Sequence, residues 1–122
     1  MPSPRTIDLI ADARGLAASD LKDWGPVASP LGAPVSQTRG VILHRPGDKD
    51  FPESGVWECS PGSWRCEVDR SEFCHFLAGH CVYTHDGGET IEIRPGMTAW
   101  FPAGWKGRCE VKETIRKVYA IV

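Results

Sequence analysis

The chain has 122 residues, of which 41% are hydrophobic and 25% are charged, and its formal net charge is −2. This length fits one folded domain, and this balance of hydrophobic and charged residues is typical of a globular protein. The sequence has no basic run and no apolar run long enough to cross a bilayer, so neither nucleic acid nor membrane is an expected partner.

Residues 1–38 are expected to form a Pro-rich N-terminal arm that packs on the rest of the domain or on a second subunit. Glycine and proline interrupt the stretch 25–34, and this excludes a regular helix there. Just before it, residues 19–25 are expected to make one short helical turn that ends at Gly25. Charged residues between positions 5 and 14 interrupt the apolar stretch that a signal peptide needs.

The pattern becomes that of β-strands over residues 39–122, which are expected to fold as one barrel. Short runs rich in Val, Ile, Trp, Tyr, Phe and Cys alternate with turns rich in Gly and Pro, which is typical of an all-β sandwich or barrel. The expected strands are 38–44, 54–59, 63–68, 72–85, 89–94, 97–102, 107–112 and 114–121. The long run 72–85 is expected to bend or break at Gly79, and the sequence Asp86-Gly87-Gly88 to close a tight hairpin.

The chain has five cysteines, an odd number, and none of them forms a CxxC pair. This spacing is not typical of a zinc ribbon or of a disulfide scaffold. Most of the cysteines lie in apolar β-patterned stretches, where reduced cysteine behaves as a small hydrophobic residue. We therefore expect a reducing compartment and a cytoplasmic location.

Two segments, 62–79 and 96–107, carry the spacing that identifies the fold. In the first, Glu72 is followed after six residues by Gly79. In the second, Gly96 is followed after five residues by Pro102 and then by Gly104. These spacings resemble the two cupin motifs, and the resemblance implies an RmlC-like jelly-roll β-barrel, an all-β fold.

Shorter sequence words narrow the resemblance to one group of cupins. They are Gly55-Val56-Trp57-Glu58-Cys59, Glu72-Phe73-Cys74-His75, Pro102-Ala103-Gly104-Trp105-Lys106-Gly107 and Glu113-Thr114-Ile115-Arg116-Lys117-Val118-Tyr119. These words are similar to the small cupins named after the (S)-ureidoglycine aminohydrolase cupin domain. The group includes the ethanolamine-utilisation cupin, and many of its members have no established activity.

The resemblance implies a metal site of three histidines and one glutamate, from which this sequence departs. The His-x-His pair falls on residues 65 and 67, or on 66 and 68 with a shorter spacing, and the last histidine falls on Gly107. Glu72 is the only metal-ligand position retained, and divalent transition ions favour convergent imidazole ligands. No tightly bound metal and no cofactor is expected. A divalent metal would need a site rebuilt from Cys66, Glu72 and a displaced histidine.

Glu72 is the candidate catalytic residue. Strand alternation places it on the barrel interior with Cys74 and Phe76, and a carboxylate there needs a partner. The candidate partners are Arg65, Lys106 and Lys117. Glu72 is then either an acid–base or anchoring group in a ligand pocket, or half of a structural ion pair.

Six further residues are candidates for ligand binding: Trp57, Trp64, Arg65, Cys74, Trp100 and Lys106. Aromatic walls with a few polar groups are typical of small-ligand pockets, although tryptophan also fills barrel cores and dimer faces. Lys106 is either a point charge for a substrate carboxylate or phosphate, or an exposed loop lysine. The alternating charges at 112, 113, 116 and 117 are expected on a solvated strand face.

The predicted function is binding of a small anionic or nitrogen-containing metabolite in the barrel, without a tightly bound metal. One alternative is a metal-dependent enzyme of the ureidoglycine aminohydrolase type, and metal-free catalysis by Glu72 is another. A third is a non-catalytic structural or accessory dimer, whose barrel should be filled by side chains. A homodimer is expected in each case, because exposed sheet edges need to be covered.

Overall fold

The structure is a computed structural model that describes residues 6–122. In this part of the chain the regular structure is almost entirely β, with one short 3-10 helix, η1 (Ala18–Asp20). The strands are β1 (Lys22–Pro26), β2 (Gln37–His44), β3 (Glu53–Cys59), β4 (Gly62–Glu67), β5 (Glu72–His85), β6 (Thr90–Ile93), β7 (Thr98–Phe101) and β8 (Lys106–Ile121). Within residues 6–122, no helix is long and apolar enough to cross a membrane.

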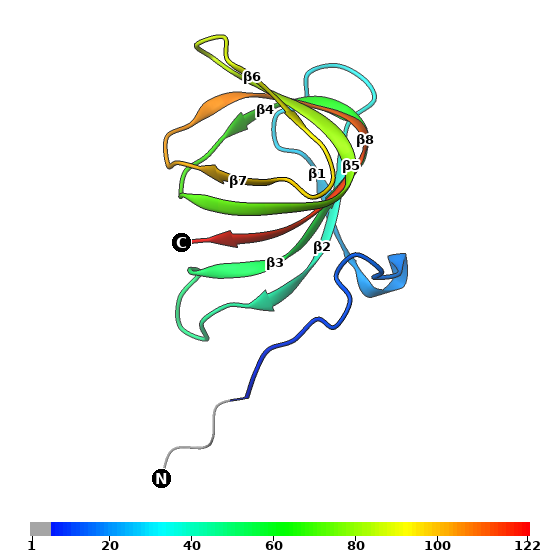
Figure 1. The fold of residues 1–122 in the computed structure, drawn as a ribbon, viewed down its shortest axis with the longest axis vertical. Helices are drawn as coiled ribbons and strands as arrows, with labels where there is room; N and C mark the ends of the chain where they lie inside the picture. The colour runs from blue at the N-terminus through cyan, green and yellow to red at the C-terminus, as the bar shows by residue number, and fades with distance from the viewer. Residues whose placement is uncertain (1–5) are drawn as a thin grey trace.

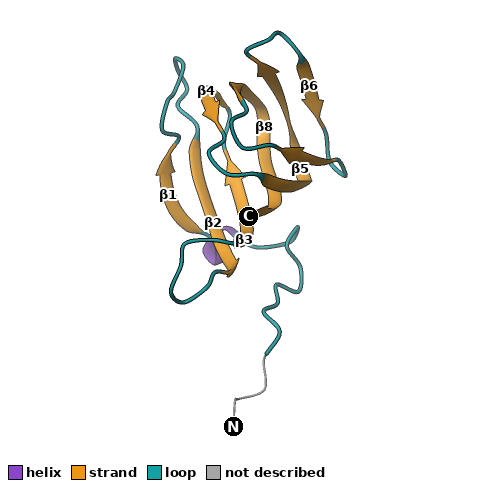
Figure 2. Cartoon of the chain, turned by 90° about the vertical axis from the view of Figure 1, so that its left-hand side faces the viewer, coloured by secondary structure: helices purple, strands orange, loops and turns teal. Residues whose placement is uncertain are grey.

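All strand pairings are antiparallel, and the long strands β5 and β8 hold the two halves of the domain together. The main path through the sheet is β1-β2-β3-β8-β5-β6, while β4 pairs with β8 and β7 pairs with β5. The two long strands curve strongly, so the sheet closes around one interior (Figures 1 and 2). This arrangement is a jelly-roll β-barrel, as the sequence predicts.

The bend of β5 is centred on Gly79. The strand is not broken there, but its register against β8 shifts on both sides of this residue. Gly79 has a φ of 91°, and a Cβ at this position would lie 2.1 Å from the carbonyl oxygen of Thr114. Only glycine tolerates this conformation and this close approach of β8. β8 also runs unbroken from residue 106 to 121, where two strands are expected from the sequence.

The N-terminal region differs from the expected arm. The expected helical turn over 19–25 is wrong, because only residues 18–20 are helical and β1 begins at Lys22. β1 pairs with β2 and extends the sheet, so the expected boundary between residues 38 and 39 falls inside β2. The ring of Trp24 covers Gly40, where a Cβ would lie 2.3 Å from the ring. Backbone pairing and this contact outweigh the low β-propensity of the sequence Trp-Gly-Pro.

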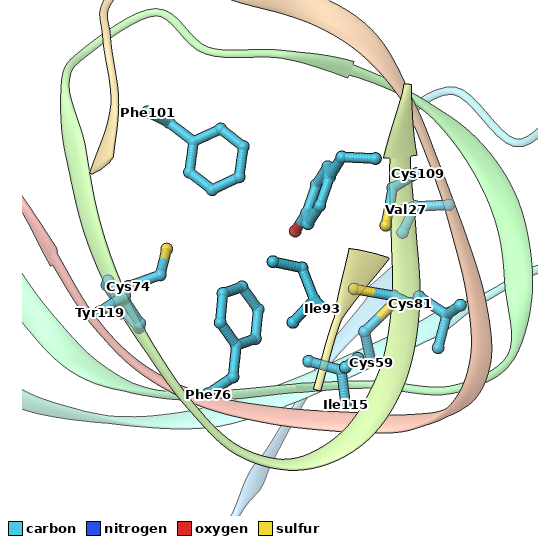
Figure 3. Close-up of a cluster of buried hydrophobic side chains, with 12 residues drawn as sticks. Val27, Cys59, Cys74, Phe76, Cys81, Ile93, Phe101, Cys109, Ile115 and Tyr119 are labelled. Atoms are coloured by element: carbon cyan, nitrogen blue, oxygen red, sulfur yellow. The ribbon is translucent and has the colours of Figure 1, made fainter. Parts of the chain in front are cut away.

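The core is the interior of the barrel (Figure 3). Its fully buried side chains are Cys59, Cys74, Phe76, Cys81, Ile93, Cys109 and Ile115. All five cysteines are free thiols and four of them are buried, in line with the expectation of reduced core residues. Cys66 is half-buried and lies at the edge of this core.

Candidate ligand-binding cavity

A cavity of about 530 Å³ opens into the barrel on one side of the core. This volume is within the usual range of small-molecule sites, roughly 300–1,000 Å³. Most of the wall is aromatic or apolar, and carboxylates and two cations complete it. The lining residues are Trp24, Phe51, Glu53, Trp57, Trp64, Cys66, Glu67, Val68, Asp69, Arg70, Glu72, Tyr83, Phe101, Lys117, Tyr119 and Ile121.

A buried ion pair forms the polar part of the inner wall. Lys117 Nζ donates to Glu72 Oε2 at 2.8 Å, and only 10% of the Lys117 side chain is exposed. The Cys74 thiol donates to the same oxygen at 3.0 Å, and Lys117 Nζ lies 3.4 Å from Cys74 Sγ. The ammonium group also lies over the ring of Trp57, 4.6 Å from its centroid, in a cation–π contact.

Strand register brings these groups together. Lys117 on β8 is opposite Phe76 on β5 and opposite Trp57 on β3. Glu72 and Cys74 lie four and two residues before Phe76 and therefore share its inward face. Burial supports this alternation, because Cys74 and Phe76 are fully buried.

The ion pair keeps both of its members charged. Burial opposes the charged form of Glu72, but the Lys117 ammonium and the Cys74 hydrogen bond outweigh it and hold the pKa of Glu72 below its usual range. Burial also opposes the charged form of Lys117, but the Glu72 carboxylate outweighs it and raises the pKa of Lys117. Burial raises the pKa of Cys74 to about 12, so its thiol stays protonated and donates.

A second hydrogen-bonded group also contributes to the cavity wall. Tyr119 donates its hydroxyl to Glu53 Oε2 at 2.7 Å, and Arg45 Nε donates to Glu53 Oε1 at 3.0 Å. The Arg70 guanidinium lies 4.3 Å from the centroid of the Phe51 ring. Glu53, Tyr119 and Arg70 therefore each have a partner within the protein.

Comparison with known proteins identifies the fold. The EutQ-like cupin domain matches residues 47–119 of the chain. The chain belongs to this cupin family. A search of the curated proteins finds no match.

Solved structures agree with this assignment at low sequence identity. A Pseudomonas syringae protein of unknown function from the DUF861 family aligns with a TM-score of 0.76 and 20% identity, over 89% of this chain and 46% of that one. The Clostridium difficile EutQ protein aligns with a TM-score of 0.61 and 16% identity, over 70% of this chain and 62% of that one. A Thermotoga maritima DUF861 protein aligns with a TM-score of 0.55 and 24% identity, over 68% of this chain and 99% of that one. This cupin therefore spans about half of the Pseudomonas protein, and the likeness concerns the fold.

The residues of this cupin do not fit the metal that the cupin resemblance implies. Cys66 and Val68 pack against the core, whereas Arg65 lies outside the cavity and Glu67 is exposed, so Cys66 and Val68 occupy the inward places of the histidine pair. Cys66 offers one sulfur and Val68 offers no ligand atom, where the cupin motif has two imidazoles. Lys117 places a positive charge 2.8 Å from Glu72, where a metal ion would be repelled. Across residues 6–122, no group of three or more His, Cys, Asp or Glu side chains is arranged to hold a metal.

Gly107, the third histidine position, has no room for a side chain. It is opposite Cys66 in the pairing of β4 with β8. A Cβ there would lie 2.3 Å from the carbonyl oxygen of Thr84 and 2.6 Å from the ring of Trp105. The close packing of β8 against β5 therefore occupies the space that an imidazole would need.

The structure brings some of the expected site residues together and separates others. Trp57, Trp64 and Glu72 line the cavity, and Cys74 lies beside Glu72 within the core. Arg65, Trp100 and Lys106 lie outside the cavity, which corrects their expected role as pocket residues.

The reason is strand alternation, which turns these three side chains outward. Arg65 makes a two-point ion pair with Asp86, with both contacts at 2.6 Å. Trp100 is 57% exposed on β7, and Lys106 is exposed at the start of β8. Among the three candidate partners of Glu72, the structure selects Lys117.

The expectation of a solvated strand face at residues 116 and 117 is wrong. Arg116 and Lys117 are 9% and 8% exposed. They point to opposite sides of the sheet, Lys117 toward the cavity and Arg116 toward the N-terminal segment. Lys117 has the same parity in β8 as the buried residues Ile115 and Tyr119, so the period of two along this strand indicates its inward position.

Arg116 joins the outer face of the sheet to the N-terminal segment. It donates to Glu58 Oε2 through Nη2 at 2.7 Å and through Nε at 3.1 Å. Its Nη1 donates to the carbonyl oxygens of Arg14 and Leu16, both at 2.8 Å. Arg39 binds the other oxygen of Glu58, with its Nε at 2.6 Å.

Proposed function

We propose that this cupin binds a small nitrogen-containing metabolite in its barrel cavity without a tightly bound metal. The observation that carries the proposal is the cavity itself, about 530 Å³ with aromatic walls and the Glu72–Lys117 pair on its inner side. A few fixed polar groups within an apolar wall are typical of small-ligand sites. A purely structural barrel would be filled by side chains, so the cavity favours binding over that alternative.

Charge favours a neutral or cationic ligand over an anionic one. Four carboxylates line the cavity, those of Glu53, Glu67, Asp69 and Glu72, against the two cations Arg70 and Lys117. Lys117 is already neutralised by Glu72, so an anion would meet no free positive charge on the inner wall. Aromatic rings attract both flat heterocycles and cations through their faces.

Glu72 is proposed as an anchoring group. Its lowered pKa keeps it ionised at neutral pH, where a general acid needs a raised pKa. An ionised carboxylate can accept a hydrogen bond from a ligand N–H. We therefore propose no general-acid step through Glu72.

Binding can be tested with nitrogen heterocycles of known chemistry. Imidazole, 2-aminopyridine, nicotinamide and indole would be titrated into ¹⁵N-labelled protein that has been treated with EDTA. The five tryptophans provide indole N–H signals that report on the cavity wall. At least one probe should shift the signals of Trp57 and Trp64 in a saturable way.

Matched tryptophan variants provide the control. Trp57→Phe should weaken binding, because it removes part of the wall and of the surface that meets the ligand. Trp100→Phe should leave binding unchanged, since Trp100 lies outside the cavity. Failure of every probe to shift signals of cavity residues would overturn the proposed function.

We further propose that the protein is a homodimer. Phe73 and Trp100 are opposite each other in the pairing of β5 with β7 and are 39% and 57% exposed. Met97, at the start of the same region, is 38% exposed. A second subunit that packs here would bury this apolar face and cover the edge of the short strand β7. Light scattering should give twice the chain mass of 13.4 kDa, and Trp100→Glu should return the monomer.

A cytoplasmic location remains our proposal as well. It is supported by the five free thiols, which persist where the compartment is reducing. Fractionation of cells that express the tagged protein from its own promoter tests it.

A further inference from the structure

One carboxylate oxygen of Glu72 is left for a ligand. Both hydrogen bonds to this side chain, from Lys117 and from Cys74, end on Oε2. Oε1 has no hydrogen-bond donor within residues 6–122. This oxygen is accessible from the cavity, because 21% of the Glu72 side chain is exposed and the residue lines the cavity. Oε1 can therefore accept a hydrogen bond from whatever fills the cavity.

Tyr83 offers a second unused polar group in the same cavity. The residue is only 2% exposed and lines the cavity, yet its hydroxyl has no hydrogen-bond partner in the described part of the chain. It is not among the fully enclosed unpaired atoms, so its oxygen reaches the cavity surface. A buried hydroxyl without a partner costs free energy, and native structures rarely leave one unused. Burial raises the pKa of Tyr83 well above its usual range, so the neutral hydroxyl is a donor.

Phe101 connects the two groups. It is opposite Glu72 in the pairing of β5 with β7, and its ring centroid lies 4.9 Å from that of Tyr83. Tyr83 therefore packs against the residue that is paired with Glu72. The Tyr83 ring is itself held by Trp105, with centroids 6.0 Å apart at 82°. The acceptor on Glu72 and the donor on Tyr83 thus lie on either side of Phe101 in the wall of one cavity.

The charge of this wall selects among ligands. Glu72 and Lys117 form a neutral pair, so a full charge brought beside it would meet one like charge at short range. A neutral group with an N–H donor next to a carbonyl acceptor matches both unused atoms without adding charge. Hydrogen-bonding groups placed in this way reject analogues that lack the matching atom, because the buried protein atom is then left unpaired.

We propose that the ligand presents a neutral, planar amide or lactam edge, whose N–H binds Glu72 Oε1 and whose carbonyl accepts from the Tyr83 hydroxyl. This rests on the proposed function and makes Tyr83 the residue that determines ligand class. The remaining aromatic wall, formed by Trp57 and Trp64, contacts the flat body of the ligand.

Four monosubstituted benzenes of similar size test whether the cavity recognises an amide edge. Benzamide has both the donor and the carbonyl, acetophenone has the carbonyl alone, benzylamine has a cationic donor alone, and benzoate is the anion. Each would be titrated by NMR into EDTA-treated wild-type protein, with indole as a probe that lacks the carbonyl. Benzamide should bind most tightly, about threefold to tenfold tighter than acetophenone, which is the usual effect of one hydrogen bond.

The variant Tyr83→Phe removes the hydroxyl and keeps the ring. It should weaken benzamide and acetophenone by about threefold to tenfold and leave benzylamine unchanged, because only the first two use the carbonyl contact. Trp100→Phe, which lies outside the cavity, should change none of the four affinities. If Tyr83→Phe folds poorly, the relative affinities of the four probes for the wild-type protein still test the proposal.

The outcomes separate this inference from the proposed function. If benzoate binds as tightly as benzamide, or if folded Tyr83→Phe binds benzamide as tightly as the wild type, the amide edge is overturned. Binding of indole without selectivity among the four probes would also overturn it, while the proposed function would stand. Absence of binding by every probe, indole included, would overturn both.

Discussion

Lys117 Nζ lies 2.8 Å from Glu72 Oε2, on the inner wall of the cavity. The two residues are 45 positions apart in the chain and meet because β8 and β5 pair along their whole length. Glu72 is the one metal-ligand position of the cupin motifs that this chain keeps, and its counter-charge is here a lysine. The barrel thus carries its own cation, and this relationship underlies the proposal of a metal-free site.

Removal of the cation should destabilise the protein more than removal of the whole pair. Lys117→Met leaves an unpaired carboxylate that is about four-fifths enclosed, and breaking a buried ion pair costs about 3 kcal/mol. The double variant Glu72→Gln, Lys117→Met removes both charges and should recover about half of that loss. Urea unfolding of the wild type, both single variants and the double variant measures these differences.

The pH dependence of stability follows from the same pair. The pKa of Glu72 is lowered on folding, so its contribution is present above its unfolded pKa of about 4.3 and is lost as pH falls through the folded value. The pKa of Lys117 is raised, so its contribution is full below its unfolded pKa of about 10.4 and is lost as pH rises through the folded value. The difference in stability between wild type and Glu72→Gln should be constant from about pH 6 to 9 and shrink below about pH 4. A difference that grows on acidification would contradict this assignment.

Arg116 should hold the N-terminal segment in place. Arg116→Lys loses the guanidinium contacts to the carbonyl oxygens of residues 14 and 16, and amide hydrogen exchange in residues 13–21 should become faster. Arg39→Lys is the matched control, because Arg39 binds the same Glu58 carboxylate but is 41% exposed. Equal exchange rates in the two variants would mean that Glu58 alone positions the segment.

Gly107 should tolerate no side chain. Gly107→Ala places a methyl group against the carbonyl oxygen of Thr84 and should lower the free energy of unfolding by about 2 kcal/mol. Gly47→Ala is the control, since nothing lies within 4 Å of a Cβ there and its φ is not in the left-handed region. Equal unfolding midpoints for the two variants would show that β8 and β5 can move apart at this point.

Turn chemistry and alternation predict an all-β sandwich or barrel and part of the site, and the resemblance to the cupin motifs narrows the fold to a jelly-roll barrel. Glycine and proline separate the strands, and the period of two in β5 places Glu72, Cys74 and Phe76 on one inward face, as the structure shows for the two buried residues. Trp57 and Trp64 follow from the same reasoning, because both are aromatic residues of short strands and line the cavity.

The remaining site residues depend on contacts that a single strand does not encode. The period of two in β8 places Lys117 on the inward face with Ile115 and Tyr119, but its contact with Glu72 depends on the pairing of β8 with β5. Strand β1 forms through pairing with β2, although Gly25 and Pro26 lower its intrinsic β-propensity. From the sequence, Tyr83 is predicted only as a core residue of β5. Its proposed role in binding depends on the structure, in which its hydroxyl is buried without a partner in the described part of the chain.

The most direct test of a metal-free binding site is an NMR titration of the nitrogen heterocycle panel into EDTA-treated protein, repeated after addition of one equivalent of Zn²⁺ and then of Mn²⁺. We predict saturable shifts at Trp57, Trp64 and Glu72 in the metal-free sample, with the same affinity after Zn²⁺ is added and no local broadening of these signals by Mn²⁺. Binding that appears only after metal is added, together with Mn²⁺ broadening centred on Glu72, would contradict the account.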